Sequence, residues 1–196
     1  ITTGDRTTLT NGNCKIYNCT FNDSGYAYFN AGYVNSLKLT GCGSEVKGNK
    51  FSTNPGILAE YWGNNFIFDD NIFYNAHYES GDSGTLYSGR DWTFRGNEIT
   101  NNIFIAGLDQ DQQGENCAIY LDDCFSSALV DNNSITGYQL GIQMGGGRDN
   151  IITNNTMTDC RRALSADARG TESGADLSEL MSNLSAVPYN GTLYQT

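Results

Sequence analysis

Residues 117–170 read CAIYLDDCFSSALVDNNSITGYQ, then LGIQMGGGRDNIITNNTMTDCRR, then ALSADARG. When Ile119, Ile142 and Leu164 are aligned, three copies of one unit appear, spaced 23 and 22 residues apart. Each unit holds a short alternating strand, a Gly or Asp corner, a second short strand and an Asn-rich turn. This length is too short for a helix pair. It predicts one coil of a parallel β-helix, in which equivalent positions stack about 4.8 Å apart.

Pairs of apolar residues five positions apart extend the repeat towards the N-terminus. The pairs are Ile16 and Phe21, Val46 and Phe51, Phe68 and Phe73, Phe94 and Ile99, Val130 and Ile135, and Ile152 and Met157. Three residues after the first member of each pair stand Cys19, Asn49, Asn71, Asn97, Asn133 and Asn155. Stacked asparagines can hydrogen-bond amide to amide, and asparagine tolerates the left-handed conformation of a tight corner. The sequence therefore predicts an all-β fold, a right-handed parallel β-helix over residues 1–172 with an asparagine ladder.

The period is lost after Gly170. Leu177, Leu180, Met181 and Leu184 have helical spacing, which predicts one short helix in residues 173–196. We expect this helix to cap the open end of the β-helix, because that end would otherwise present unpaired strand edges. The last residues, from Pro188, are expected to run as a strap along the outside of the same domain.

Composition limits the partners. The net charge is −11, and this disfavours nucleic acid and anionic membrane surfaces, which attract Lys and Arg. No stretch approaches the roughly 18 apolar residues of a membrane span. We expect a monomeric, secreted or cell-surface protein whose partner is a polysaccharide or oligosaccharide.

Metal-binding patterns are weak. The six cysteines lack the paired CxxC spacing of a zinc site. The polar insertion over about 105–116 is expected to form the rim or lid of a site, and its DQDQQGE stretch slightly resembles a calcium loop. Its spacing fails the EF-hand rule, so no metal or cofactor is expected, with calcium left open. His77, the single histidine, is expected to be a surface loop residue.

Strand alternation assigns a row of outward side chains. If Leu86, Ile119, Ile142 and Leu164 point inward, the next residue in each coil points outward. This gives Tyr87, Tyr120, Gln143 and Ser165, which are groups suited to sugar hydroxyls. Two residues further on, the outward positions hold Gly89, Asp122, Gly145 and Asp167.

Asp122 and Asp167 are candidate catalytic residues. Two coils separate them by roughly 9 to 10 Å, with the notch of Gly145 between them. Inverting glycosidases hold their acid and base about 6.5 to 9.5 Å apart, so such a mechanism is within reach. Asp123 is a candidate base beside Asp122, or a neighbour that raises the pKa of Asp122.

The corner that follows carries charges of both signs. Arg90 and Arg148 are candidates to bind substrate or tune the carboxylates, whereas Asp91, Asp149 and Arg169 are expected mainly to form ion pairs that hold the corner. The neighbouring aromatics Tyr61 and Trp62 are open between two interpretations. They either pack in the core or offer a flat face to a sugar ring.

The stretches SGDSGTLYSGRDWTFRGNEI, AIYLDDCFSS, GGGRDNIITNN and DARG resemble a group of bacterial secreted right-handed parallel β-helix proteins of the pectate-lyase-like class, several of them carbohydrate-active. The likeness covers about residues 79–170, and the chain resembles a C-terminal part of those longer proteins. The resemblance implies a groove on one face that binds glycan chains, with acidic residues for cleavage in the hydrolase branches. This fold also hosts lyases, esterases and non-catalytic binders.

Three functions follow from these observations. The first is an inverting glycoside hydrolase, or a fragment of one, acting on a neutral polysaccharide through Asp122 and Asp167. The second is a polysaccharide lyase, which needs a Lys or Arg base and is disfavoured by the acidic charge. The third is a non-catalytic glycan-binding or structural β-helix.

Overall fold

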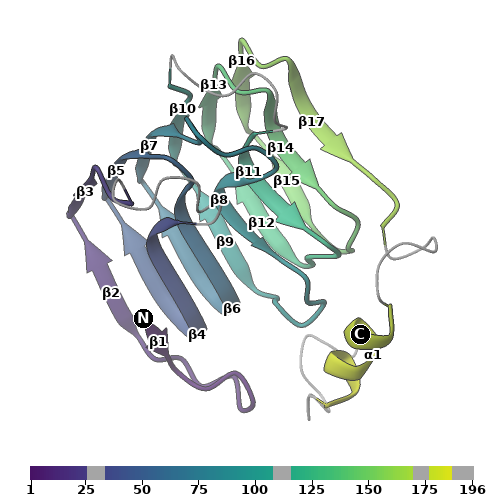
Figure 1. Cartoon of the computed structure of the whole chain (residues 1–196). Helices are drawn as coiled ribbons and strands as arrows, with labels where there is room; N and C mark the ends of the chain where they lie inside the picture. The colour runs from purple at the N-terminus through teal and green to yellow at the C-terminus, as the bar shows by residue number, and fades with distance from the viewer. Residues whose placement is uncertain (26–33, 108–115, 170–176, 187–196) are drawn as a thin grey trace.

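The computed structural model describes residues 1–25, 34–107, 116–169 and 177–186. Within these ranges the chain forms strands that wind into a stack of coils, followed by one short helix (Figure 1). Neighbouring strands of each face come from successive coils and pair in parallel, as in Ile119 beside Ile142 and Phe73 beside Phe104. The all-β parallel β-helix and the single C-terminal helix are both as the sequence predicts.

The coils have three faces. The first consists of β1 (Thr2–Thr3), the first halves of β4 (Asn35–Lys47) and β6 (Ile57–Asp69), β8 (Gly84–Gly89), β11 (Cys117–Asp122), β14 (Leu140–Met144) and β17 (Arg162–Ala166). The second consists of β2 (Cys14–Tyr17), the second halves of β4 and β6, β9 (Asn97–Thr100), β12 (Ala128–Asp131) and β15 (Ile151–Thr153). The third consists of β3 (Thr20–Asn22), β5 (Lys50–Asn54), β7 (Ile72–Ala76), β10 (Ile103–Ile105), β13 (Ser134–Thr136) and β16 (Thr156–Thr158).

Two long strands join the first face to the second, because each bends at a glycine. Gly41 in β4 has a φ of +111°, and Gly63 in β6 has a φ of +146°. A Cβ on Gly63 would lie 1.9 Å from the carbonyl oxygen of Gly41. Only glycine permits this close approach of two bent strands.

The register of the first face is confirmed. Leu86, Ile119, Ile142 and Leu164 are paired in that order across β8, β11, β14 and β17. Tyr87, Tyr120, Gln143 and Ser165 form the next row of pairs. Asp122 pairs with Gly89, so the assignment of the outward row also holds at this position.

The asparagine ladder exists, but one member of the predicted set is wrong. Its members are Asn49, Asn71, Asn102, Asn133 and Asn155. Each of the first four donates its backbone N–H and one amide hydrogen to the side-chain oxygen of the next, at 2.9 to 3.0 Å. Asn102 stands where Asn97 was expected. Ile99 is accordingly paired with Phe68, and Phe104 with Phe73. Asn97 instead begins β9, where its side chain accepts from Phe66 N–H and donates to Gly63 O.

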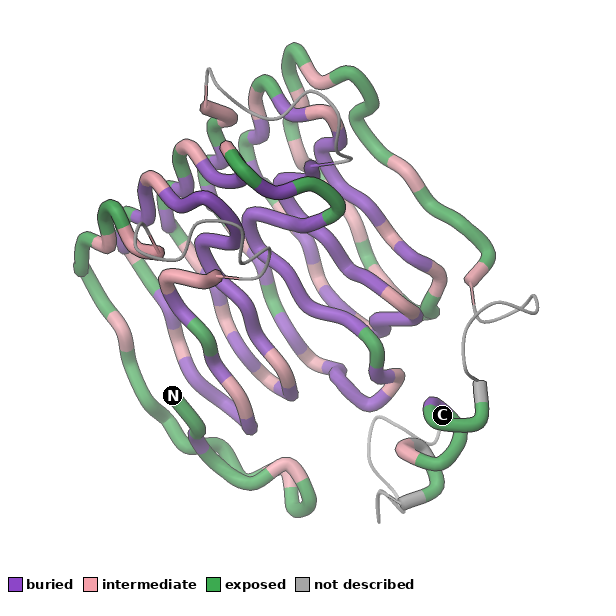
Figure 2. Tube along the Cα trace, viewed as in Figure 1, coloured by how far each residue is buried: buried purple, intermediate pink, exposed green. Residues whose placement is uncertain are grey.

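The core lies inside the coils and is continuous along their axis (Figure 2). On the third face it is a column of phenylalanine rings, in which Phe21, Phe51, Phe73 and Phe104 stack with centroids 4.6 to 5.0 Å apart. This distance is the spacing of the strands themselves, so identical residues in one register position stack ring on ring.

The helix α1 (Leu177–Ala186) lies beyond the lower end of β17 and off the stack of strands (Figure 1). The inward-facing Leu164 of the last coil keeps 45% of its surface exposed. Helix α1 therefore does not cover Leu164, although it was predicted to cap this end. The predicted strap and most of the predicted lid lie outside the described residues. No described helix has the length and hydropathy needed to cross a membrane.

Candidate functional site

The outward row of the first face is largely buried. Tyr87, Tyr120 and Gln143 are only 4%, 5% and 6% exposed. The rings of Tyr87 and Tyr120 meet edge to face at 5.6 Å, and they pack with Ile57, Cys117 and Leu140. The outer face of the first sheet therefore carries its own apolar cluster, separate from the core inside the coils.

Gln143 has an unmet hydrogen-bonding need within this cluster. Its side-chain oxygen Oε1 is buried and has no hydrogen-bond partner in the described part of the chain. An unsatisfied buried acceptor costs about 1 to 3 kcal/mol. Such an atom marks the place where a water or a ligand hydroxyl would be stabilised.

Arg169 joins the candidate carboxylates. Its Nη1 donates to Asp122 Oδ1 at 2.8 Å and to Asp123 Oδ1 at 3.0 Å. Its Nε and Nη2 contact Asp167 Oδ2 at 2.9 and 2.8 Å, and its backbone N–H donates to Asp167 Oδ1. Arg90 adds a second cation, with Nε 3.4 Å from Asp123 Oδ2. The three candidate catalytic residues thus share one guanidinium.

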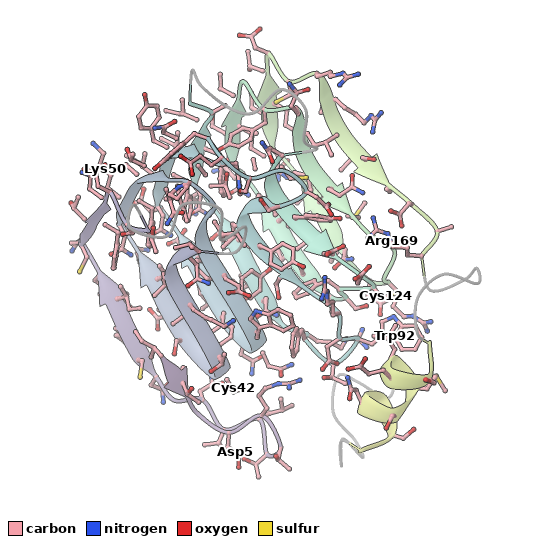
Figure 3. All side chains as sticks on the ribbon, in the orientation of Figure 1. Asp5, Cys42, Lys50, Trp92, Cys124 and Arg169 are labelled. Carbon is pink, nitrogen blue, oxygen red and sulfur yellow. The ribbon has the colours of Figure 1, made fainter. Side chains whose placement is uncertain are left out.

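The notch at Gly145 is the space that this guanidinium uses. A Cβ on Gly145 would lie 3.1 Å from the Cζ and Nη1 of Arg169. Figure 3 shows Arg169 and Cys124 at the corner that follows the first face. The contacts of Arg169 limit the nearest oxygens of Asp122 and Asp167 to at most about 8 Å apart, an upper limit that overlaps the range of inverting glycosidases. The cation occupies the position that the scissile bond and water would need.

The carboxylates around Arg169 shift the pKa values of the groups that contact them. Burial and the charge of Asp122 raise the pKa of Tyr87, whose hydroxyl donates to Asp122 Oδ2 at 2.8 Å. Burial alone would lower the pKa of Arg169, but hydrogen bonds with Asp167, Tyr120 and Asp123 outweigh it and raise that pKa. Charge-assisted hydrogen bonds of this kind are about twice as strong as neutral ones.

The remaining candidates divide between inside and outside. Tyr61 is fully buried in the core against Phe66, Phe68 and Phe125, so of the two interpretations the core one holds for it and the sugar-binding one does not. Trp62 lies outside, half-buried, beside Glu60 and below the Nζ of Lys38. The two aromatics differ because successive strand residues point to opposite faces.

The expectations for the arginines are met in part. Arg148, expected to bind substrate or tune the carboxylates, is exposed and lies over the ring of Trp92 at 5.4 Å. Arg169 forms the predicted ion pairs, and its partners are the candidate carboxylates themselves. Asp91 and Asp149 do form the predicted ion pairs, with Arg6 and Arg95. The sequence signal for Arg169 was its position two residues after Asp167, from which its backbone N–H and its Nε both reach the Asp167 carboxylate.

The surface histidine prediction is also wrong. His77 is fully buried, with its Nδ1 2.7 Å from Ser83 Oγ and its Nε2 without a partner among the described residues. Burial lowers the pKa of His77 to about 3. It is therefore a neutral interior residue at ordinary pH.

Stacked coils, a polar ladder at one corner and a row of outward polar and aromatic groups define a repeat protein of the parallel β-helix class. Over residues 2–191 the chain matches the family described as "Periplasmic copper-binding protein (NosD)", and it belongs to that family. The periplasmic location in this description agrees with the predicted location outside the cytoplasm. No curated protein matches the chain significantly, and neither does any solved structure.

Proposed function

We propose that the chain is a non-catalytic glycan-binding β-helix of the cell envelope, which binds sugar through the outer face of β6, β8, β11 and β14. The buried, partnerless Oε1 of Gln143 is the observation that supports this most directly. A sugar hydroxyl that donates to it would repay a cost already present in the free protein. Trp62, half-buried at the edge of the same cluster, offers a ring against which the sugar packs.

The ion pairs that Asp122 and Asp167 make with Arg169 favour glycan binding over glycan cleavage. A general acid must hold a proton and a general base must be free to take one. Asp122 and Asp167 instead each accept hydrogen bonds from the cationic side chain of Arg169. These ion pairs with Arg169 hold the surface around Gln143 in place. They also neutralise part of the carboxylate charge where a neutral sugar would lie.

Copper, the metal in the family's description, does not fit the described residues. They contain no group of three or more His, Cys, Asp or Glu side chains that could hold a metal ion. None of the six cysteines is bonded to another, and His77 directs its Nδ1 to Ser83 inside the fold. Soft sulfur and imidazole donors are what copper prefers.

An inverting glycoside hydrolase is the second candidate, supported by the separation of Asp122 and Asp167. It requires Arg169 to leave the notch when substrate enters. A lyase is less well supported, because its base would have to be an arginine, and Arg169 is held with a raised pKa by three partners.

The deciding experiment combines a binding and a cleavage assay on neutral and uronic polysaccharides, with and without calcium. We expect binding to neutral glycans without release of reducing ends. The variant Gln143→Met keeps the volume but removes the acceptor, so it should lower affinity at least tenfold while leaving the fold intact. Equal affinity in the variant would refute the proposed site. Reducing ends that appear with the parent and fall about 10² to 10⁴-fold in Asp122→Asn would establish the hydrolase instead.

A further inference from the structure

The outer face of the third sheet is chemically unlike the rest of the surface. Two rows of outward side chains run across its six strands. They are Thr20, Lys50, Ile72, Ile103, Ser134 and Thr156 in one row, and Asn22, Ser52, Tyr74, Ile105, Thr136 and Thr158 in the other. Of these twelve side chains only Lys50 is charged, although the chain carries 22 acidic residues. We call this surface the neutral strip.

Large apolar side chains occupy the centre of the neutral strip. Ile72 and Tyr74 of β7 are paired with Ile103 and Ile105 of β10, and the four are 38% to 41% exposed. Isolated exposed apolar residues are ordinary, but four in contact on adjacent strands form a patch of the kind that binds partners. On one side lie the exposed hydroxyls of Ser134, Thr156 and Thr158, and on the other side Ser52 is buried and donates its hydroxyl to Asn22 Oδ1.

The strip rests on a rigid support. Directly beneath it, the inward residues of the same strands are the stacked rings of Phe51, Phe73 and Phe104. The asparagine ladder fixes the corner at which each of these strands begins. The outward groups are therefore held at the strand spacing of about 4.8 Å, which reduces the entropy lost on binding.

Shape decides which kind of partner fits. Six strands give a length of about 24 Å, and the two rows lie about 7 Å apart. A stable complex between two folded proteins buries about 800 Å² on each side, which is much more than this strip offers. A long, narrow surface suits one extended polymer strand, and the lack of charge suits a neutral one.

We propose that the neutral strip is a second glycan-binding site, which takes a neutral polysaccharide strand lying across β5, β7, β10 and β13. Tyr74 packs its ring against a sugar face, the isoleucines contact its C–H groups, and the Ser and Thr hydroxyls bond its hydroxyls. This inference rests on the proposed glycan-binding function but uses a different face from Gln143. In Figure 3, Lys50 marks β5, the strand of the strip next to β3.

The test compares matched tyrosines on two faces. Tyr74 is 39% exposed on the strip, and Tyr17 is 37% exposed on the outer face of β2. Binding of the intact chain to soluble oligosaccharides of cellulose, xylan and mannan is measured by titration calorimetry. We expect two sites per chain, of which Tyr74→Ser removes or weakens one at least tenfold, whereas Tyr17→Ser changes neither.

The outcomes separate the two proposals. If Gln143→Met weakens binding and Tyr74→Ser does not, the neutral strip is not a site and the first proposal stands alone. If Tyr74→Ser weakens binding and Gln143→Met does not, only the strip binds glycan. A dimer in sedimentation experiments that Ile103→Thr dissociates would overturn the inference, because the strip would then contact a second copy. Absence of all glycan binding would overturn both proposals.

Discussion

Replacing Asn102 by Ala tests the corrected register of the ladder, because Asn102 lies in its middle. The side chain is buried, and it makes four hydrogen bonds. Its Nδ2 donates to Phe68 O and to Asn133 Oδ1, and its Oδ1 accepts from the N–H and Nδ2 of Asn71.

Truncation to Ala would leave two backbone groups without their side-chain hydrogen-bond partner. The N–H of Asn71 and the carbonyl of Phe68 would each lose the side chain that they contact, whereas the Nδ2 of Asn71 would keep Val46 O. At about 1 to 3 kcal/mol for each stranded group, the free energy of unfolding should fall by about 2 to 6 kcal/mol. That is a large part of the 5 to 15 kcal/mol typical of a domain.

Urea unfolding at pH 7 measures this loss, and the neighbouring Asn101 supplies the control. Asn101 is exposed and has a φ of +57°, so Asn101→Gly keeps the backbone conformation and removes only surface hydrogen bonds. It should cost about 1 kcal/mol or less. A loss below about 0.5 kcal/mol in Asn102→Ala, or equal losses in the two variants, would refute the role of the ladder.

Three further predictions concern the core, the notch and the buried histidine. Ile142→Ala should destabilise the fold by about 2 to 5 kcal/mol in the same unfolding assay, because the stacked coils cannot close the cavity, and a negligible loss would contradict the inward assignment. Gly145→Ala should cost about 1 to 3 kcal/mol, because the new methyl group meets the guanidinium of Arg169, and adding Arg169→Ala should recover part of this loss. The pKa of His77 is about 3 in the fold and about 6.5 when unfolded, so the unfolded state binds the extra proton between these values. Stability should therefore fall by up to about 1.4 kcal/mol per pH unit as the pH drops from 6.5 towards 3, and His77→Gln should show a shallower pH dependence of its melting temperature.

The fold could be predicted because the last coils contain few insertions. Between Cys117 and Ala166 the aligned residues of the first-face strands follow at 23 and 22 residues, and one aligned residue per coil fixes the direction of all the others. In the coils with longer insertions, a short local pattern led to the wrong assignment of Asn97 to the ladder. Gly96 and Asn97 look like Gly48 and Asn49, since both pairs join a left-handed glycine to an asparagine at a corner. The sequence NNIF that begins at Asn101 matches the NIF that begins at Asn71, and this longer match identifies the ladder.

The site was harder to predict than the fold, because strand parity gives direction but not exposure. Tyr87 and Tyr120 point outward as expected, yet they bury each other. The role of Arg169 depends on a long side chain that reaches back over Gly145 to the coil of Asp122, a distance that spacing along the chain does not reveal.

The two proposed binding faces differ in what holds their side chains. On the first face, the outward groups are held by each other, through the apolar cluster and the network around Arg169. On the third face, they are held only by the strands, because the side chains of Ile72, Tyr74, Ile103 and Ile105 are exposed. A substitution on the first face therefore alters its neighbours as well as any ligand contact. A substitution on the neutral strip changes the surface alone, which makes Tyr74 the cleaner place to ask whether this β-helix binds glycan at all.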